Sequence, residues 1–141
     1  MGQQANQRGN QSKRTRSGGT TNEGVLTMAM SSGEMQTCVS NCTECHKSCV
    51  TTLTYCLQQG GKHVAADHIQ VLIDCAASCQ ECINFMLRES KFHPKTCGIC
   101  AEICTACATS CESMGEDQQM KHCAESCRTC AESCQKMVAA A

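Results

Sequence analysis

Cysteines that recur at alternating steps of three and four residues constrain this chain more than any other feature. The 141 residues include 17 cysteines, which fall into four groups along the chain. The only longer step is seven residues, from Cys49 to Cys56, where Thr52 takes the intervening position. This spacing places side chains on one face of an α-helix, so each group predicts one helix with a cysteine seam. The groups are Cys38, Cys42, Cys45, Cys49 and Cys56; Cys75, Cys79 and Cys82; Cys97, Cys100, Cys104, Cys107 and Cys111; and Cys123, Cys127, Cys130 and Cys134.

Short breaks between the groups set the expected helix boundaries. The seams are interrupted at three places: Gly60-Gly61, the segment 90–94, which contains the single proline Pro94, and Gly115. Glycine just past a helix end and proline at a helix start are typical boundary signals. Because such short connections force successive helices to run antiparallel, the chain is predicted to be all-α, an up-down-up-down four-helix bundle with a cysteine-lined core. The expected helices are 33–59, 63–90, 94–114 and 117–138, with 22–30 as a candidate short extra helix across one end.

The N-terminal segment differs in composition from the rest of the chain. Residues 1–22 contain four basic and no acidic side chains and are rich in Gly, Gln, Asn and Ser. Such a segment has little to bury and is predicted to be a disordered basic tail, which leaves 23–141 as the bundle domain. No apolar run follows the basic residues, and no stretch approaches the roughly 20 apolar residues of a membrane span. We therefore expect a cytoplasmic protein without a membrane or nucleic-acid partner.

The thiols are expected to be free rather than paired in disulfides. The cysteine count is odd, and the spacing suits helices rather than the loops of a disulfide-stapled secreted domain. If packing alone were required, Ala or Val would fill a narrow core without the risk of oxidation. The pattern therefore indicates metal binding rather than catalysis, and no enzymatic activity is predicted.

Methionine and histidine continue the cysteine seams toward their ends. In an antiparallel bundle one set of these residues should meet at one end and the second set at the other. His46, His63 and His122 lie off the seams and are predicted to face solvent. The predicted metal ligands besides the cysteines are Met35, Met86, His93 and His68. The set for one end is Met35, Met86, His93 and Met137, and the set for the other is His68, Met114 and Met120.

The ligand set favours Cu(I), several ions per chain. Residues three or four apart on a helix have Cβ atoms roughly 5–6 Å apart, so two thiolates can bracket a small ion. Soft thiolate and thioether ligands select Cu(I), and one Cu(I) per thiolate leaves the core close to neutral. Zinc would need closed sites of four ligands, which would bury excess negative charge. A zinc or cadmium buffer and a thiol redox protein remain alternatives; an iron–sulfur protein is a weaker one, because 97–107 departs from the ferredoxin spacing.

The repeated CxxxC and CxxC pairs, such as Cys38-Val-Ser-Asn-Cys42-Thr-Glu-Cys45 and Cys123-Ala-Glu-Ser-Cys127-Arg-Thr-Cys130, resemble those of the bacterial copper storage proteins. The resemblance covers roughly residues 33–138. It implies storage of many Cu(I) ions inside the bundle for buffering, detoxification and supply to cuproenzymes, through unidentified donor and acceptor proteins. It also implies a homotetramer and a copper mouth near the start of the first helix, carried here by Met28, Met30 and Met35 with Met86 and His93. The absence of a twin-arginine signal matches the cytosolic branch.

Overall fold

The computed structural model describes the backbone of residues 22–140 and the side chains of residues 33–140. Within residues 22–140 the chain forms four long α-helices and one short 3₁₀ helix, in agreement with the predicted all-α fold. Residues 1–21, which hold all of the predicted basic tail 1–22 except Asn22, lie outside the described part. In chain order the elements are α1 (Asn22–Gln59), η1 (Gly61–Val64), α2 (Ala66–Leu87), α3 (His93–Glu112) and α4 (Gln118–Ala139).

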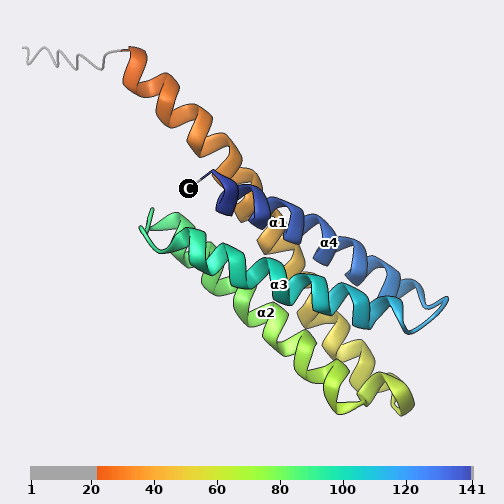
Figure 1. The fold of residues 1–141 in the computed structure, drawn as a ribbon. Helices are drawn as coiled ribbons and strands as arrows, with labels where there is room; N and C mark the ends of the chain where they lie inside the picture. The colour runs from red at the N-terminus through yellow and green to blue at the C-terminus, as the bar shows by residue number, and fades with distance from the viewer. Residues whose placement is uncertain (1–21, 141) are drawn as a thin grey trace, which may run out of the picture.

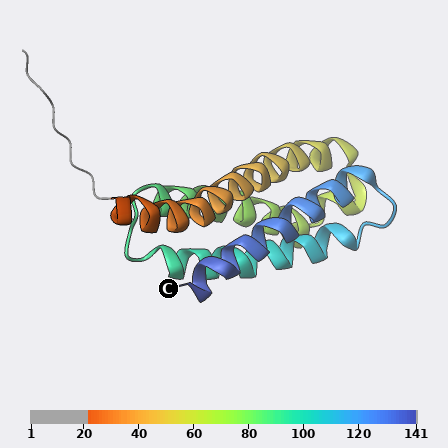
Figure 2. The ribbon, with the colours of Figure 1, turned by 90° about the horizontal axis from the view of Figure 1, so that it is seen from above.

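The four helices form an antiparallel bundle around one long axis, as Figures 1 and 2 show. Within the described residues α1 packs against α2 and α4, and α3 packs against α2 and α4. The diagonal pairs α1/α3 and α2/α4 make no comparable backbone approach there. Each helix therefore turns one face toward a shared central axis, where the four cysteine seams converge.

Helix α1 is longer than expected and replaces the predicted extra helix. It has 38 residues, against 22 in α2, and its first turns project past the end of the bundle (Figure 1). The prediction that 22–30 forms a separate helix across the bundle end is therefore wrong. No helix-breaking signal separates the two stretches, because Gly33 alone costs only about 1 kcal/mol in a helix. The side chains of Met28 and Met30 lie outside the described residues.

The first connection differs from its prediction in detail. Instead of one helix from residue 63, η1 forms a single tight turn and α2 starts at Ala66. Ala65 separates the two elements with an extended backbone, φ −54° and ψ 135°. Gly60 and Gly61 both have positive φ, 69° and 57°, a region in which a Cβ atom is costly. The two glycines thus end α1 and reverse the chain.

The other two connections are fixed by local hydrogen bonds. After α2, the N–H groups of Glu89 and Ser90 donate to the carbonyls of Met86 and Phe85, a Schellman motif. Glu89 takes the left-handed position of that motif, with φ 50°. Before α4, the Asp117 carboxylate accepts from the Met120 N–H at 3.2 Å and caps the helix.

Sulfur fills the core that aromatic rings fill in most domains. The chain has two Phe and one Tyr, and none of the three is buried. Among the fully buried side chains of residues 33–140, only four are larger than cysteine: Leu72, Met86, Met120 and Thr52. Because cysteine is small and apolar when protonated, the helices can lie close to the axis.

Candidate metal-binding core

All seventeen cysteines are completely buried free thiols. Each has a relative exposure of 0%, and none forms a disulfide. The predicted inward seams are confirmed. The cause is helical periodicity, since steps of three and four keep every cysteine of a helix on the face that packs against the neighbouring helices.

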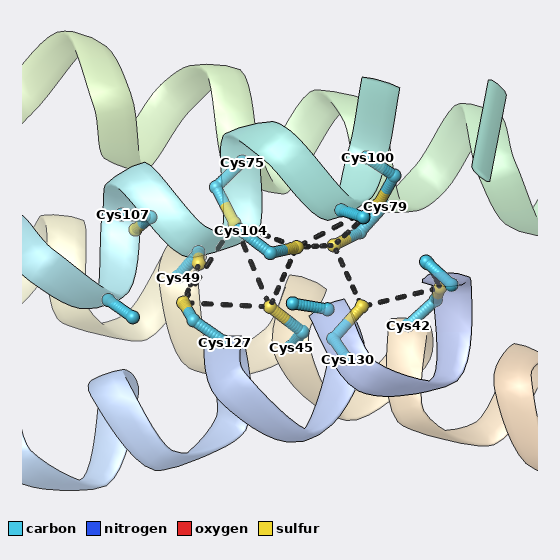
Figure 3. Packing of buried hydrophobic residues seen from close by; sticks show 14 of the residues in the cluster. Cys42, Cys45, Cys49, Cys75, Cys79, Cys100, Cys104, Cys107, Cys127 and Cys130 are labelled. Atoms are coloured by element: carbon cyan, nitrogen blue, oxygen red, sulfur yellow. Dashed lines mark hydrogen bonds between the residues drawn. The ribbon is translucent and has the colours of Figure 1, made fainter. Parts of the chain in front are cut away.

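The sulfur atoms form one contact network along the axis. Figure 3 shows its central part, where Cys75 lies 3.6 Å from Cys104 and 3.7 Å from Cys45, and Cys79 lies 3.8 Å from Cys130. These contacts join all four helices. A metal–sulfur bond of about 2.3 Å places two sulfurs of a tetrahedral or trigonal site about 3.8–4.0 Å apart. The thiols therefore already lie close to the separations that coordination needs, without backbone movement.

Overlapping groups of four thiols repeat along the bundle. In each group the four sulfurs lie within 4.8 Å of one another, and all members are buried. Neighbouring groups share cysteines, so an ion bound in one group lies next to the ligands of another. The column can thus exchange ions by replacing one ligand at a time. The groups include Cys42, Cys82, Cys100 and Cys134; Cys79, Cys100, Cys104 and Cys130; Cys45, Cys75, Cys79 and Cys104; and Cys49, Cys107, Cys123 and Cys127.

Close packing of thiols makes their ionisation interdependent. Contacts with Cys100 and other neighbouring thiols, together with burial, raise the pKa of Cys79. Contacts with Cys104 and other thiols, which can donate to a thiolate, instead lower the pKa of Cys45. Two adjacent thiolates repel each other in a buried site, so the metal-free core must retain many of its protons. A soft cation that replaces those protons also removes the repulsion.

One end of the bundle gathers the predicted methionine and histidine residues, here called the Met/His end. Met86 and Met137 are buried, while Met35 and His93 are half-buried. They come from the bundle part of α1, the end of α2, the start of α3 and the end of α4, and so meet as the antiparallel topology predicts. Immediately inside lies Cys82, whose sulfur is 3.2 Å from that of Cys97.

His93 places a buried ring nitrogen at this end that can act as a metal ligand. Its Nδ1 atom is buried and has no hydrogen-bond partner among the described residues. A buried polar atom without a partner normally costs about 1–3 kcal/mol, which makes such an atom uncommon outside functional sites. The imidazole also contributes to the lowered pKa of the Cys97 thiol, after the larger effects of Cys134, Cys38 and Cys82.

The opposite end of the bundle carries a second histidine on the seam. The Nε2 atom of His68 lies 3.4 Å from Cys56 Sγ, and its Nδ1 atom lies 2.7 Å from Ser110 Oγ. Burial lowers the pKa of His68, which favours the neutral ring that a metal requires. Met114 and Met120 are buried at the same end, as predicted.

Two of the three off-seam histidines are not solvent-facing, contrary to the prediction. His46 is half-buried, with Nδ1 2.8 Å from the Ala76 carbonyl on α2. His63 lies 3.0 Å from the Asp117 carboxylate, with 14% of its side chain exposed. Periodicity places both residues on a flank of their element, and only the packing of a neighbouring element decides whether a flank is covered. His122 is exposed as predicted.

The sequence reasoning missed a polar network at the end of the bundle opposite the Met/His end. Asp117 accepts from the Tyr55 hydroxyl at 2.8 Å as well as contacting His63. Gln119 donates to the buried Thr52 hydroxyl at 2.9 Å. The position of Asp117 just before a helix was a usable capping signal, whereas its partners lie about 60 residues away and left no signal in the sequence.

Comparisons with known proteins bear on the same residues. The family model described as copper storage protein matches residues 31–139. The structure of the Nmul_A1745 protein from Nitrosospira multiformis is 46% identical, with a TM-score of 0.73 over 78% of this chain and 99% of that one. The Cu(I)-bound copper storage protein BsCsp3 of Bacillus subtilis is 32% identical, with a TM-score of 0.70 over 74% and 98%.

A further similar structure is a cytosolic copper storage protein from Streptomyces lividans that holds five coppers. It is 26% identical, with a TM-score of 0.71 over 76% of this chain and 93% of that one. Among residues 22–140, no helix combines the length and apolar character needed to cross a membrane. The family match covers the whole bundle and every cysteine in it. The chain belongs to the copper storage protein family.

Proposed function

We propose that this protein stores Cu(I) ions, several per chain, on the thiolates of its core and performs no catalysis. The observation that carries this proposal is the core of seventeen free, fully buried thiols, most of which make sulfur contacts of 3.2–4.0 Å. Each Cu(I) that binds displaces a thiol proton and neutralises one thiolate, so filling does not accumulate buried charge. Divalent ions in all-thiolate groups of four would leave two negative charges per site. The charge balance therefore favours a monovalent soft ion.

The Met/His end is the proposed mouth of the store. Met35, Met86 and His93 are neutral ligands, and they lie directly outside Cys82 and Cys97. A neutral thioether or imidazole binds Cu(I) less tightly than a thiolate, so an ion captured there can pass inward to the nearest thiols. Movement through the shared-ligand groups then needs only one sulfur exchange at a time.

We further propose that the protein acts in the cytoplasm as a homo-oligomer, with the tetramer of the family as the expected state. Free thiols persist in reducing compartments, and the Streptomyces lividans relative is described as cytosolic. Apolar side chains remain open on the outer faces of the helices, among them Leu57, Leu87 and Ile99, which supports association. No membrane or nucleic-acid partner is proposed.

Anaerobic titration of the reduced protein with Cu(I), against a competing chelator, tests the storage function. We expect tight equivalents on the order of the cysteine count, with proton release during loading. A Cys79→Ser variant should lose about one equivalent, whereas Ser78→Ala, next to it in the chain, should keep full capacity. Saturation at four or fewer equivalents would overturn the proposal. One hyper-reactive thiol in a thiol titration would instead favour the redox alternative.

A further inference from the structure

Two buried side chains interrupt the thiol column at the end opposite the Met/His end. Thr52 takes a seam position on α1 between Cys49 and Cys56, and Leu72 takes one on α2 between Cys75 and His68. Both are 0% exposed and therefore occupy the core itself. Neither can bind a soft metal. On the α1–α2 side of the bundle, the pair formed by Cys56 and His68 is thus separated from the main column.

This Cys56–His68 pair is held in a defined orientation. His68 is 3% exposed, and the contact from its Nδ1 to Ser110 Oγ at 2.7 Å fixes the ring. In the tautomer in which Nδ1–H donates to Ser110, the Nε2 lone pair faces Cys56 Sγ at 3.4 Å. A hydrogen bond on the far nitrogen of a histidine is the usual support of a metal-bound imidazole.

Thiols on α3 and α4 face the same region. Cys111 directly follows Ser110, whose hydroxyl lies 2.7 Å from His68 Nδ1, and Cys123 lies near the start of α4, at the same end of the bundle as Met120. Both thiols are fully buried and can each supply a further sulfur ligand. Imidazole with two or three thiolates is a zinc ligand set, in contrast to the all-sulfur groups of the column.

We propose that the Cys56–His68 pair is the nucleus of a Zn(II) site at the end of the Cu(I) column opposite the Met/His end, with further thiolate ligands from α3 and α4. Metal–sulfur and metal–nitrogen bonds of about 2.3 and 2.0 Å at a tetrahedral angle put the two donors about 3.5 Å apart, whereas a linear arrangement needs about 4.3 Å. The observed 3.4 Å fits the tetrahedral geometry.

Charge also favours a divalent ion at this site. Zinc with three thiolates and one neutral imidazole leaves a net charge of −1, whereas zinc in an all-thiolate group leaves −2. Buried uncompensated charge is costly, so this end is where zinc competes best. The proposal stands apart from the storage function, although it draws on Cys56 and His68, two of the proposed copper ligands. Each Zn(II) that binds displaces the protons of its thiol ligands, with no change of oxidation state.

Zinc titration of the reduced, metal-free protein against a chelating indicator tests the site, with Co(II) as a spectroscopic probe. We expect one Zn(II) equivalent that is tighter than the rest, and a Co(II) spectrum typical of a tetrahedral site with sulfur and nitrogen ligands. Ser110→Ala, which leaves both ligands in place, should weaken this equivalent 10- to 100-fold. His68→Ala and Cys56→Ser should abolish it. The matched controls Ser113→Ala, at the exposed residue that follows α3, and His93→Ala, at the Met/His end, should leave it intact.

The results separate this site from the storage function. Unchanged zinc affinity in Ser110→Ala and His68→Ala, with helical content retained by circular dichroism, would overturn the zinc site. So would several equal zinc equivalents with no distinct first one. If His68→Ala does not fold, His68→Gln replaces it. Cu(I) capacity is measured in parallel on the wild-type protein: a low capacity contradicts storage only, whereas a high capacity without the zinc equivalent contradicts the zinc site only.

Discussion

Asp117 connects three separate parts of the chain through one side chain. It caps α4 through Met120, accepts from Tyr55 at the end of α1 and contacts His63 in η1. The rings of Tyr55 and His63 also meet edge to face, with centroids 5.8 Å apart. Although burial opposes ionisation, the hydrogen bonds from Tyr55 and His63 and from backbone N–H groups hold the pKa of Asp117 below its usual value. At the scale of single residues, this carboxylate stabilises the end of the bundle opposite the Met/His end.

Removing this carboxylate should destabilise the metal-free protein. Asp117→Ala deletes the helix cap and leaves two hydrogen-bond partners unpaired, so we expect a loss of about 1–2 kcal/mol in the free energy of unfolding. Urea unfolding in reducing buffer measures it. Glu116→Ala is the matched control, because that side chain is 94% exposed and contacts only Lys121. A loss in the control as large as that in Asp117→Ala would contradict the assignment.

The contribution of Asp117 should also depend on pH. Its native pKa is lowered, so the stabilisation is complete above the unfolded-state pKa of about 3.9. It disappears as pH falls through the lower native pKa, because both states are then protonated. The difference in unfolding free energy between the wild type and Asp117→Asn should therefore be constant from pH 7 to about pH 5 and shrink at lower pH. A difference that grows below pH 4 would refute this reading.

The termini of the helices show which local choices are strained and which are favourable. Glu89 occupies the left-handed position of the Schellman motif after α2, where glycine is the usual residue. A residue with a Cβ atom loses roughly 1–2 kcal/mol in that conformation. Within α1, Thr52 is another residue that departs from its local pattern: it occupies a buried seam position, whereas the neighbouring seam positions hold cysteine.

Replacing Glu89 with glycine should stabilise the protein. Relief of the left-handed strain is expected to raise the free energy of unfolding by about 1 kcal/mol. Glu81→Gly is the matched control, because Glu81 is exposed inside the regular part of α2. There glycine should cost about 1 kcal/mol. Thermal unfolding of both variants decides the matter, and a stability loss in Glu89→Gly would show that the turn is not strained.

Completing the seam of α1 should enlarge the store. Thr52→Cys places a thiol between Cys49 and Cys56, and we expect about one additional tight Cu(I) equivalent in the competitive titration. The substitution also removes the hydrogen bond from Gln119, so a small loss of stability without metal is expected. Thr51→Cys, one residue earlier on the exposed face, should add a thiol that reacts readily but no tight equivalent. Equal gains in the two variants would contradict a requirement for the core position.

The molecule as a whole has a core that a soft metal completes. Cysteine buries less apolar surface than Leu or Phe, and the largest fully buried side chains are few. Metal that binds the native thiols but finds no preformed site in the unfolded chain must stabilise the fold. The store and the fold are therefore energetically linked.

Copper loading should raise the unfolding temperature progressively. Each tightly bound Cu(I) adds to the stability of the native state by mass action, so the midpoint should rise with each equivalent up to saturation. Far-ultraviolet circular dichroism during anaerobic heating measures it. Mg(II), a hard cation that prefers oxygen ligands, should leave the midpoint unchanged. A constant midpoint across the Cu(I) titration would mean that copper binds outside the core.

Much of this protein is determined by the sequence alone, because helical periodicity is local. The steps between cysteines specify which face of each helix is buried, and the short breaks specify the antiparallel order; both were predicted correctly. The seam also predicted the ends at which Met86, His93 and His68 lie. Their roles as metal ligands stay predictions.

Only the tertiary structure decided what depends on the rotation and axial shift of one helix against another. Four contacts join residues that lie 30 to 62 positions apart in the sequence. They are His46 with Ala76, His63 with Asp117, His68 with Ser110, and Tyr55 with Asp117. Periodicity assigns a residue to a face but not to a partner. Single helix-breaking residues were equally ambiguous: Gly33 lies inside a continuous α1, whereas Ala65, a good helix former, separates η1 from α2. The reason is that packing energy overrides local propensities that differ by about 1 kcal/mol or less.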